Sequence, residues 1–375
     1  MRYMRISALK PGMITAGHLY DGSGRLMLAA NCALTTGLIH RLDSLKFHGA
    51  YVLDSKDDQD YRPLLDDRFR RDAIQSLKGL DVDQLVYVAN AITNQVMFST
   101  DRLYDMQTVC DYDSLTYMHC VNVAVLSVMT GVAMGLDNDS LTELGQGALL
   151  HDIGKTMVDP HIIKGSHRLS DEEFKEVRRH PQYGYDMLAR CSAISENVRL
   201  AVLHHHEKED GTGYPARLSG DQIPLYAKII HAADVYDALV SARSYKKRMN
   251  PADALENLMA GAGTDFDTTC VDALRNSVAL YPVGTKVRLS NGSEAYVKEN
   301  HKGYPSRPLL SSQTGIPIDL LRMAHAQRRL AHSLCDALAH AAHGHACTDH
   351  AFMYVSALLH RYASFSCLIG WTAPG

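Results

Sequence analysis

Apolar residues recur at helical spacing through most of the segment from residue 104 to residue 280. Leu141, Leu144 and Leu149 illustrate the pattern, which is typical of helices that bury one face. Gly and Pro cluster at 211–224, which predicts a loop between helices. The sequence therefore predicts a mainly α protein built around an all-helical domain at residues 104–280.

Two short stretches in this domain predict helix beginnings. Both SLTE (Ser140 to Glu143) and SDEE (Ser170 to Glu173) place a glutamate three residues after a serine, which fits the capping box. The apolar run at 121–136, which contains no charged residue and no histidine, is shorter than the roughly 20 residues that a membrane span needs. We expect it to form a buried core helix and expect no membrane span.

The segments before the helical domain predict a small β-rich domain at residues 1–62. HLYDGSGRLML reads as strand, turn and strand, and GAYVLD reads as a later strand after a helical stretch at 36–46. Residues 63–103 carry helical periodicity without evident chemistry and are interpreted as a helical connector.

After the helical domain, Asn291-Gly292 lies between two alternating runs and predicts a short β hairpin within a small β extension at residues 281–321. Residues 322–375 form an Ala/His-rich tail whose composition differs from the rest. The sequence leaves open whether this tail folds or belongs to the native reading frame, and a weak affinity of its histidines for metal is the minor interpretation.

Composition narrows the classes of function. With 46% hydrophobic and 21% charged residues, the chain is typical of globular proteins, and a net charge of −4 argues against nucleic acid as a partner. The start lacks the apolar stretch of a signal peptide, and the eight cysteines form no CxxC pair. We therefore expect a cytoplasmic protein with reduced thiols.

Histidines and aspartates in the helical domain are the candidates for chemistry. ALLHDIGK places His151 and Asp152 at the end of an apolar helix, where ionisable groups cost several kcal/mol unless they are paired or bind metal. Imidazole and carboxylate together suit Fe, Mn, Zn or Ni. The sequence around His151 and Asp152 contains no cysteine, which argues against a closed zinc site with thiolate ligands. A single helical histidine is more often a core residue, so the pattern as a whole carries this hypothesis. The other candidates are His119, His180, the histidines at 204–206, and Asp234, which has Asp237 as a neighbour on one helix face.

The order of these residues resembles the HD superfamily of metal-dependent phosphohydrolases. HHEKEDGTGYP (His205 to Pro215) is similar to the HD-GYP subfamily, whose pattern is His-His-Glu, two variable residues, Asp-Gly, one variable residue and Gly-Tyr-Pro. HDIGK, HPQYG and DVYDALVSARSYKK also match, so the resemblance covers about residues 105–275.

The resemblance implies two divalent metal ions, iron or manganese, in an HD-type helical domain. One metal would be held by His119, His151, Asp152 and Asp234, and the other by His180, His205 and His206, with Asp152 bridging both. It also implies that Asp152 and Lys155 are catalytic and that Lys155, Tyr214, Arg243 and Lys246 bind substrate.

Three features need separate expectations. His204 precedes the family pattern and is expected to be a surplus histidine near or outside the site. The glycines at 211 and 213 are expected to end the helix that carries the paired histidines. Some family members carry a glutamate where Leu115 stands, which supports a third metal; leucine cannot bind metal, and Asp113 is a weak substitute, so two metals are expected.

The implied function is a phosphodiesterase that hydrolyses cyclic di-GMP to the linear dinucleotide pGpG, with onward hydrolysis to GMP left open. In this interpretation a hydroxide activated by two metals attacks phosphorus directly. The setting would be bacterial second-messenger signalling, and a homodimer is one possible assembly.

Two alternatives remain. One is a non-catalytic receptor or interaction protein for cyclic dinucleotides, which would have lost metal ligands. The other is an HD phosphohydrolase that acts on another nucleotide such as cyclic GMP-AMP.

Overall fold

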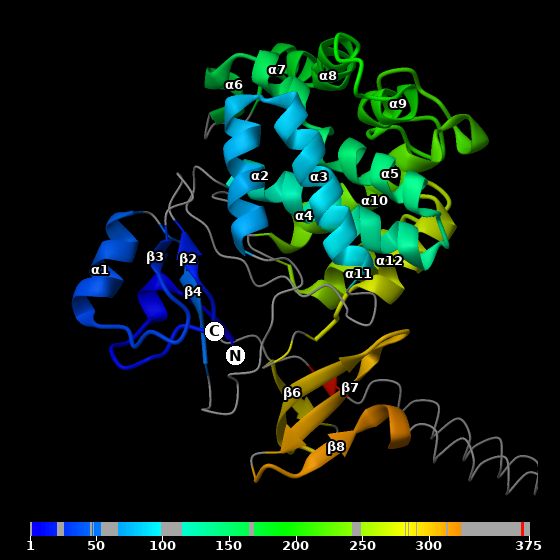
Figure 1. Cartoon of the computed structure of the whole chain (residues 1–375). Coiled ribbons are helices and arrows are strands. Elements are labelled where there is room, and N and C mark those ends of the chain that lie inside the picture. Colours follow the sequence, from blue (N-terminus) through cyan, green and yellow to red (C-terminus); the bar gives the residue numbers. More distant parts are fainter. Residues whose placement is uncertain are drawn as a thin grey trace, which may run out of the picture. The chain divides into compact units, whose positions relative to one another are not determined.

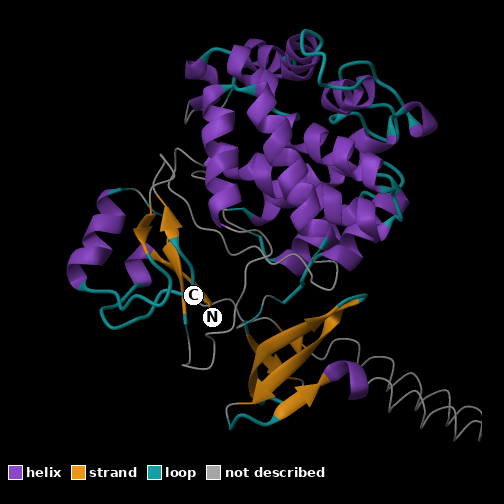
Figure 2. Cartoon of the chain, in the orientation of Figure 1, coloured by secondary structure: helices purple, strands orange, loops and turns teal. Residues whose placement is uncertain are grey.

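The computed structural model describes residues 2–20, 26–45, 47, 49–53, 67–98, 115–164, 169–241, 249–281, 283, 285–289, 291–312, 314–323 and 369–370. By its internal contacts the chain divides into two compact units, Met1–Leu280 and Tyr281–Gly375. Figure 1 traces both units along the sequence, and Figure 2 shows helices dominating the first and strands the second. The domain boundaries predicted within the first unit stay predictions.

The first 53 residues form strands around one helix. Strand β1 (Arg2–Arg5) pairs antiparallel with β4 (Gly49–Val52), and β2 (Leu19–Tyr20) pairs antiparallel with β3 (Leu26–Leu28). Helix α1 (Thr36–Ser44) begins at Thr35, whose hydroxyl accepts a hydrogen bond from the Leu38 amide at 3.2 Å. A short 3₁₀ turn, η1, covers Ile6–Ala8. The predicted strands and helix are confirmed, while the turn at 21–25 lies outside the described residues.

Helices α2 (Asp67–Gly79) and α3 (Val82–Met97) pack against the helical domain's core. On α3, the buried positions Leu85, Val88, Ile92 and Val96 follow helical spacing, so one face of the helix is apolar. These side chains join the same hydrophobic cluster as α4 (Leu115–Ala133) and α5 (Asn138–Leu150). The segment expected as a connector therefore contributes to the helical core.

Helix α4 is the central element of this domain. Its described side chains are buried from Met118 to Gly131, because α2, α3, α5, α10 and α12 all contact it. This confirms the expected buried core helix for residues 121–131, while α4 ends at Ala133, before the end of the predicted run at 136. Among the described residues, no helix is both long and apolar enough to cross a membrane.

The remaining helices belong to the same unit, and two of them, α10 and α12, contact α4. They are η4 (Ile153–Met157), α6 (Pro160–Lys164), α7 (Asp171–Val177), α8 (His180–Leu188), α9 (Glu196–His204), η5 (Gly220–Gln222), α10 (Leu225–Val240), α11 (Pro251–Ala260) and α12 (Thr268–Ser277).

One of the two predicted capping boxes is present. Ser170 accepts a hydrogen bond from the Glu173 amide at 3.2 Å, and Glu173 accepts one from the Ser170 amide at 2.8 Å. The prediction at Ser140 is wrong, because α5 begins earlier: Asp137 caps it and accepts a hydrogen bond from the Ser140 amide at 2.8 Å. Asp is as good an N-cap as Ser, and sequence spacing alone does not rank the two.

The second unit contains an antiparallel sheet with the strand order β8-β7-β6-β5-β9. The predicted hairpin joins β5 to β6 through Gly292, whose φ of +83° is a backbone conformation that glycine adopts without strain. The sheet is larger than the hairpin expected from the sequence, since an isolated hairpin has too little apolar face to be stable. Its strands are β5 (Lys286–Leu289), β6 (Glu294–His301), β7 (Tyr304–Ser312), β8 (Pro317–Asp319) and β9 (Ile369–Gly370).

The β9 strand comes from the Ala/His-rich tail. Its two residues pair with the edge of β5, as Arg288 faces Gly370 and Leu289 faces Ile369. The rest of the tail, 324–368 and 371–375, lies outside the described residues.

Candidate metal centre

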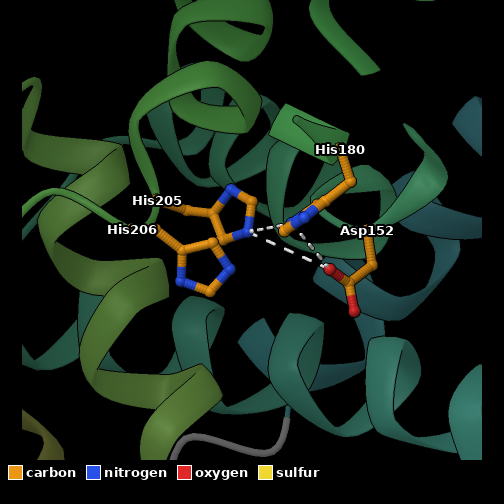
Figure 3. A group of neighbouring side chains, drawn as sticks. All are labelled: Asp152, His180, His205 and His206. Carbon is orange, nitrogen blue, oxygen red and sulfur yellow. Dashed lines mark hydrogen bonds and ion pairs between the residues drawn. The ribbon is translucent and has the colours of Figure 1, made fainter. Parts of the chain in front are cut away.

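The predicted ligands come together inside the helical domain, mostly at helix ends. They form two groups in which one ligand atom from each residue lies within 4.8 Å of the others. Figure 3 shows the first group, with the side chains pointing toward one another. The first group is Asp152, His180, His205 and His206, and the second is His119, His151 and Asp234.

Asp152 connects the two groups. One carboxylate oxygen, Oδ1, lies 3.3 Å from His180 Nε2 and 4.0 Å from His205 Nε2, while the other, Oδ2, lies 3.4 Å from His151 Nε2. Its two oxygens therefore face different sets of imidazoles, as a bridging carboxylate must.

The backbone at Gly154 lets Asp152 approach His180. A Cβ atom at Gly154 would lie 2.0 Å from the carbonyl oxygen of His180 and 2.5 Å from the Gly184 amide nitrogen. Only a residue without a side chain permits this close contact between η4 and α8. The glycine in HDIGK thus brings the end of α5 against the start of α8.

Three imidazoles are oriented by backbone carbonyls one turn earlier. The Nδ1 atoms of His151, His180 and His205 lie 2.8, 2.7 and 2.7 Å from the carbonyl oxygens of residues 148, 177 and 202 respectively. A carbonyl can only accept, so each Nδ1 carries the proton and each Nε2 presents a lone pair to the centre.

Two of these lone pairs face each other at short range. The Nε2 atoms of His180 and His205 are 3.3 Å apart, and both lack a proton in this tautomer. In addition, His151 Nε2 and Asp152 Oδ1 are buried and make no hydrogen bond with the described residues. Buried acceptors without donors are costly, and cations held in the two ligand groups would satisfy these atoms.

His119 lies between two carboxylates. Its Nε2 is 3.0 Å from Asp234 Oδ1, and its Nδ1 is 2.6 Å from Asp237 Oδ2. Asp237 is fully buried and also accepts hydrogen bonds at 3.0 Å from Asn122 Nδ2 and from Ser241 Oγ. Asp237 therefore orients His119, a role that the sequence analysis missed although the spacing from Asp234 was visible.

The surroundings of the histidine ligands shift their pKa values in opposite directions. Burial opposes charge on His119, but the hydrogen bonds to Asp234 and Asp237 outweigh it and raise its pKa to about 9. Burial and the neighbouring histidines hold the pKa of His205 well below its ordinary value, and burial does the same for the pKa of His206. Both are therefore neutral imidazoles at pH 7, the form that binds metal.

The carboxylates of the centre stay ionised. Burial disfavours the charge on Asp152, but the ammonium group of Lys155 outweighs this and holds the pKa of Asp152 well below the ordinary value. Burial likewise disfavours the charge on Asp234, but the hydrogen bond to His119 outweighs this and keeps its pKa well below the ordinary value. Cys120 is buried nearby, but burial and Asp152 raise its thiol pKa, so a thiolate ligand is disfavoured. The donor set is nitrogen and oxygen, which fits a divalent transition metal.

Lys155 lies at the edge of this centre. Its Nζ is 2.6 Å from Asp152 Oδ2, and its side chain is partly exposed. Burial opposes the charge of Lys155, but Asp152 outweighs this and raises its pKa. A fixed ammonium group beside the shared carboxylate suits contact with an anionic substrate.

The helix with the consecutive histidines ends before the glycines that were expected to end it. Helix α9 finishes at His204, His205 is its C-cap, and His206 lies beyond the helix. That prediction is wrong. Gly213 instead allows a close approach: a Cβ there would lie 2.5 Å from Glu207 Cα.

His204 is buried but belongs to neither ligand group. Its Nδ1 lies 3.6 Å from Glu207 Oε1, and Glu207 also accepts hydrogen bonds from the amides of Ala216 (2.7 Å) and Leu218 (3.1 Å). The loop with Gly213, Tyr214 and Pro215 is thereby fixed beside the centre. Tyr214 stacks on His206, with ring centroids 4.7 Å apart.

Other predicted positions are only partly visible. Arg243 and Lys246 lie in 242–248, outside the described residues, as does Asp113. Leu115 is the first residue of α4. The part of the chain that the structure describes contains no third group of His, Cys, Asp and Glu able to hold a metal.

Comparison with known proteins relates the helical region to one family. A family model described as HD domain matches residues 99–270. The cyclic di-GMP phosphodiesterase PA4108 of Pseudomonas aeruginosa is 38% identical over 224 residues, which are 60% of this chain and 54% of that protein. The cyclic di-GMP phosphodiesterase PdeB of Borreliella burgdorferi is 32% identical over 194 residues, 52% of this chain and 51% of that protein. The chain thus spans about half the length of these curated relatives.

Two further matches bear different names. The 3′3′-cGAMP-specific phosphodiesterase 3 of Vibrio cholerae is 35% identical over 164 residues, 44% of this chain and 35% of that protein. Among solved structures, Bd1817, an HDG"Y"P protein from Bdellovibrio bacteriovorus, aligns with a TM-score of 0.47 at 18% identity, covering 73% of this chain and 97% of that one.

Proposed function

Because residues 99–270 of this chain are an HD domain of the HD-GYP type, we propose that the protein is a metal-dependent phosphodiesterase that hydrolyses cyclic di-GMP to pGpG. The observation that carries the proposal is the pair of ligand groups joined by Asp152. Relatives at 38% and 32% identity that are named for this activity support the substrate.

We propose two divalent cations, iron or manganese, in this centre. His119, His151, Asp152 and Asp234 would hold one, and His180, His205 and His206 the other, with Asp152 shared. When bound, such cations supply positive charge to phosphoryl oxygens and lower the pKa of a water molecule. The nitrogen and oxygen donors support this metal class, and the orphaned Nε2 and Oδ1 atoms support its binding at this place.

The chain's own residues then position the phosphodiester. The ammonium group of Lys155, held beside Asp152, would contact a phosphoryl oxygen of the substrate. The oxygen of a water molecule, which loses a proton, forms the new bond to phosphorus while the bond from phosphorus to the sugar oxygen breaks. The departing sugar oxygen takes up a proton. Tyr214 flanks His206, which places it to line the substrate side of the centre. Arg243 and Lys246 are proposed contacts to the guanine nucleotide on the basis of the motif alone.

The setting follows from the same proposal. Free cysteines at the four described positions Cys32, Cys120, Cys191 and Cys270 support a reducing, cytoplasmic location. Bacterial relatives named for cyclic dinucleotides support a role in second-messenger signalling.

The decisive experiment is a product assay with the purified full chain, loaded anaerobically with Fe(II) or with Mn(II). Chromatography should show cyclic di-GMP converted to pGpG, and elemental analysis should find about two metals per chain. Absence of turnover with both metals, despite their binding, would overturn the proposal in favour of a non-catalytic receptor.

Cyclic GMP-AMP is a second candidate substrate, because a relative at 35% identity is named for it. Assays with both cyclic dinucleotides at equal concentration rank them by kcat/KM. A higher value for cyclic GMP-AMP would reassign the substrate and leave the metal chemistry in place.

A further inference from the structure

Arg178 lies next to the metal centre at the end of α7, within the turn that leads to His180. The central carbon of its guanidinium, Cζ, is 4.3 Å from the centroid of the Tyr214 ring. The other neighbour of Tyr214 is His206, whose ring is 4.7 Å away and inclined by 26°. Tyr214 therefore lies between Arg178 and His206, and His206 belongs to the first ligand group.

The charge of Arg178 has no carboxylate partner within the described residues. Its contacts there are the rings of Tyr214 and Phe174, and its Nε is buried without a hydrogen bond. The adjacent Arg179 differs, since it makes an ion pair with Glu176 at 3.1 Å. A guanidinium that is held against a ring but keeps unused N–H donors is prepared for an anion that the chain itself does not provide.

A cyclic dinucleotide brings such an anion. It contains two phosphodiester groups, and only one of them can lie at the metal centre during hydrolysis. The second phosphate then needs its own cationic partner nearby, and planar guanidinium groups bind phosphate oxygens through two parallel hydrogen bonds. The position of Arg178 beside Tyr214 meets this need.

We propose that Arg178, held against Tyr214, binds the non-scissile phosphate of a cyclic dinucleotide and so favours cyclic dinucleotides over substrates with one phosphodiester. This inference rests on the proposed function and adds a substrate-binding residue to it. Arg178 and Lys155 then have different roles. Lys155, beside Asp152, would contact the scissile phosphate, and Arg178 would contact the other phosphate.

The test compares Arg178→Gln with Arg179→Gln, a matched control at an exposed neighbour (62% exposed). With cyclic di-GMP, Arg178→Gln should raise KM roughly 10- to 100-fold with little change in kcat, as expected for a lost charged hydrogen bond. With bis(p-nitrophenyl) phosphate, which has no second phosphate, the rise should be at least about fivefold smaller. Arg179→Gln should behave as wild type, and both variants should keep the wild-type metal content.

Each other outcome has a defined meaning. A KM for cyclic di-GMP within twofold of wild type overturns this inference and leaves the proposed function intact. An equal rise in KM with cyclic di-GMP and with bis(p-nitrophenyl) phosphate would place Arg178 at the metal centre. A rise in KM with cyclic di-GMP but not with cyclic di-AMP would assign Arg178 to recognition of the base. Either result overturns the phosphate assignment. If Arg178→Gln does not fold, Arg178→Lys, which keeps the charge but loses the planar fork, should still raise KM. A wild-type protein that hydrolyses no cyclic dinucleotide overturns both proposals.

Discussion

The two ring nitrogens of His119 are each within 3.0 Å of a different carboxylate, Asp234 at Nε2 and Asp237 at Nδ1. Only Asp234 belongs to a ligand group, while Asp237 is buried behind the ring and fixed by Asn122. Asp237 therefore sets the ring orientation and directs Nε2 toward the centre. Such carboxylate partners of metal-binding histidines raise the basicity of the ligand.

Replacing Asp237 should weaken metal binding without removing a ligand. We expect Asp237→Asn to lower the affinity for Mn(II) about 10- to 100-fold, because the ring of His119 loses its anionic partner. Competition with a fluorescent chelator measures this affinity. Asp272→Asn, at an exposed position of α12 (60% exposed), is the control and should bind as wild type. Equal affinities for Asp237→Asn and wild type would show that Asp237 has only a packing role.

Removing the shared carboxylate should affect both ligand groups. Asp152→Ala should abolish cyclic di-GMP hydrolysis and reduce bound metal, because its two oxygens face His151 and His180 from opposite sides of the centre. Elemental analysis and the product assay together check this. Asp186→Ala, on the exposed side of α8, should retain both properties. Turnover by Asp152→Ala in metal-depleted buffer would contradict the mechanism.

Metal binding should release a proton at neutral pH. The pKa of His119 is raised to about 9 in the metal-free protein, so its imidazole is charged at pH 7 and must lose a proton to bind a cation. His205 and His206 are already neutral and release none. Affinity should therefore rise with pH between 7 and 9. Calorimetry in buffers of different ionisation enthalpy should report about one proton released per chain at pH 7; no release would contradict this charge assignment.

The same group gives the metal-free fold a pH dependence of known sign. A pKa that folding raises from 6.5 to about 9 means that the charged imidazole stabilises the folded state fully below pH 6.5. This contribution declines as pH rises and is gone above about pH 9. Urea unfolding of metal-free protein at pH 6 and pH 9.5 measures it, and Asp237→Asn should reduce the difference.

The contact at Gly154 should be sensitive to a single methyl group. Gly154→Ala would force the His180 carbonyl away, and overpacking of this kind costs about 1–3 kcal/mol in the free energy of unfolding. Because the same shift separates Asp152 from His180, metal affinity should fall as well. Gly79→Ala is the control: nothing lies within 4 Å of its added Cβ, so the variant should be as stable as wild type or up to about 1 kcal/mol more stable. Similar stabilities for the two variants would refute the close approach.

Periodicity and motif order sufficed to anticipate the helical domain and the meeting of the ligands. The apolar spacing on α4 and α5 fixes which faces are buried, and His151 and Asp152 follow the last buried turn of α5. Side chains at successive helix ends can converge only when the helices pack side by side. The sequence indicates this packing only indirectly, through the motifs that it shares with the HD-GYP subfamily.

Features that depend on tertiary contact could not be anticipated. The role of Asp237 requires knowing that α10 packs against α4, and the part of α3 in the core requires knowing that Thr93 lies against Gly145. The sequence also could not show which of two nearby residues would cap α5, where Asp137 and not Ser140 is the N-cap. The unpaired state of Arg178 depends on the surroundings of α7, whereas its neighbour Arg179 has the same side chain and a partner.

The ligands come from α4, α8, α10 and the ends of α5 and α9, so bound cations would crosslink five segments of one domain. A ligand that binds only the folded state increases its stability in proportion to the logarithm of its free concentration. The abundance of the protein would then follow the supply of the metal, because a metal-starved chain would unfold more often and be degraded sooner. A shortage of the metal would in this way shorten the lifetime of the domain as well as lower its catalytic rate.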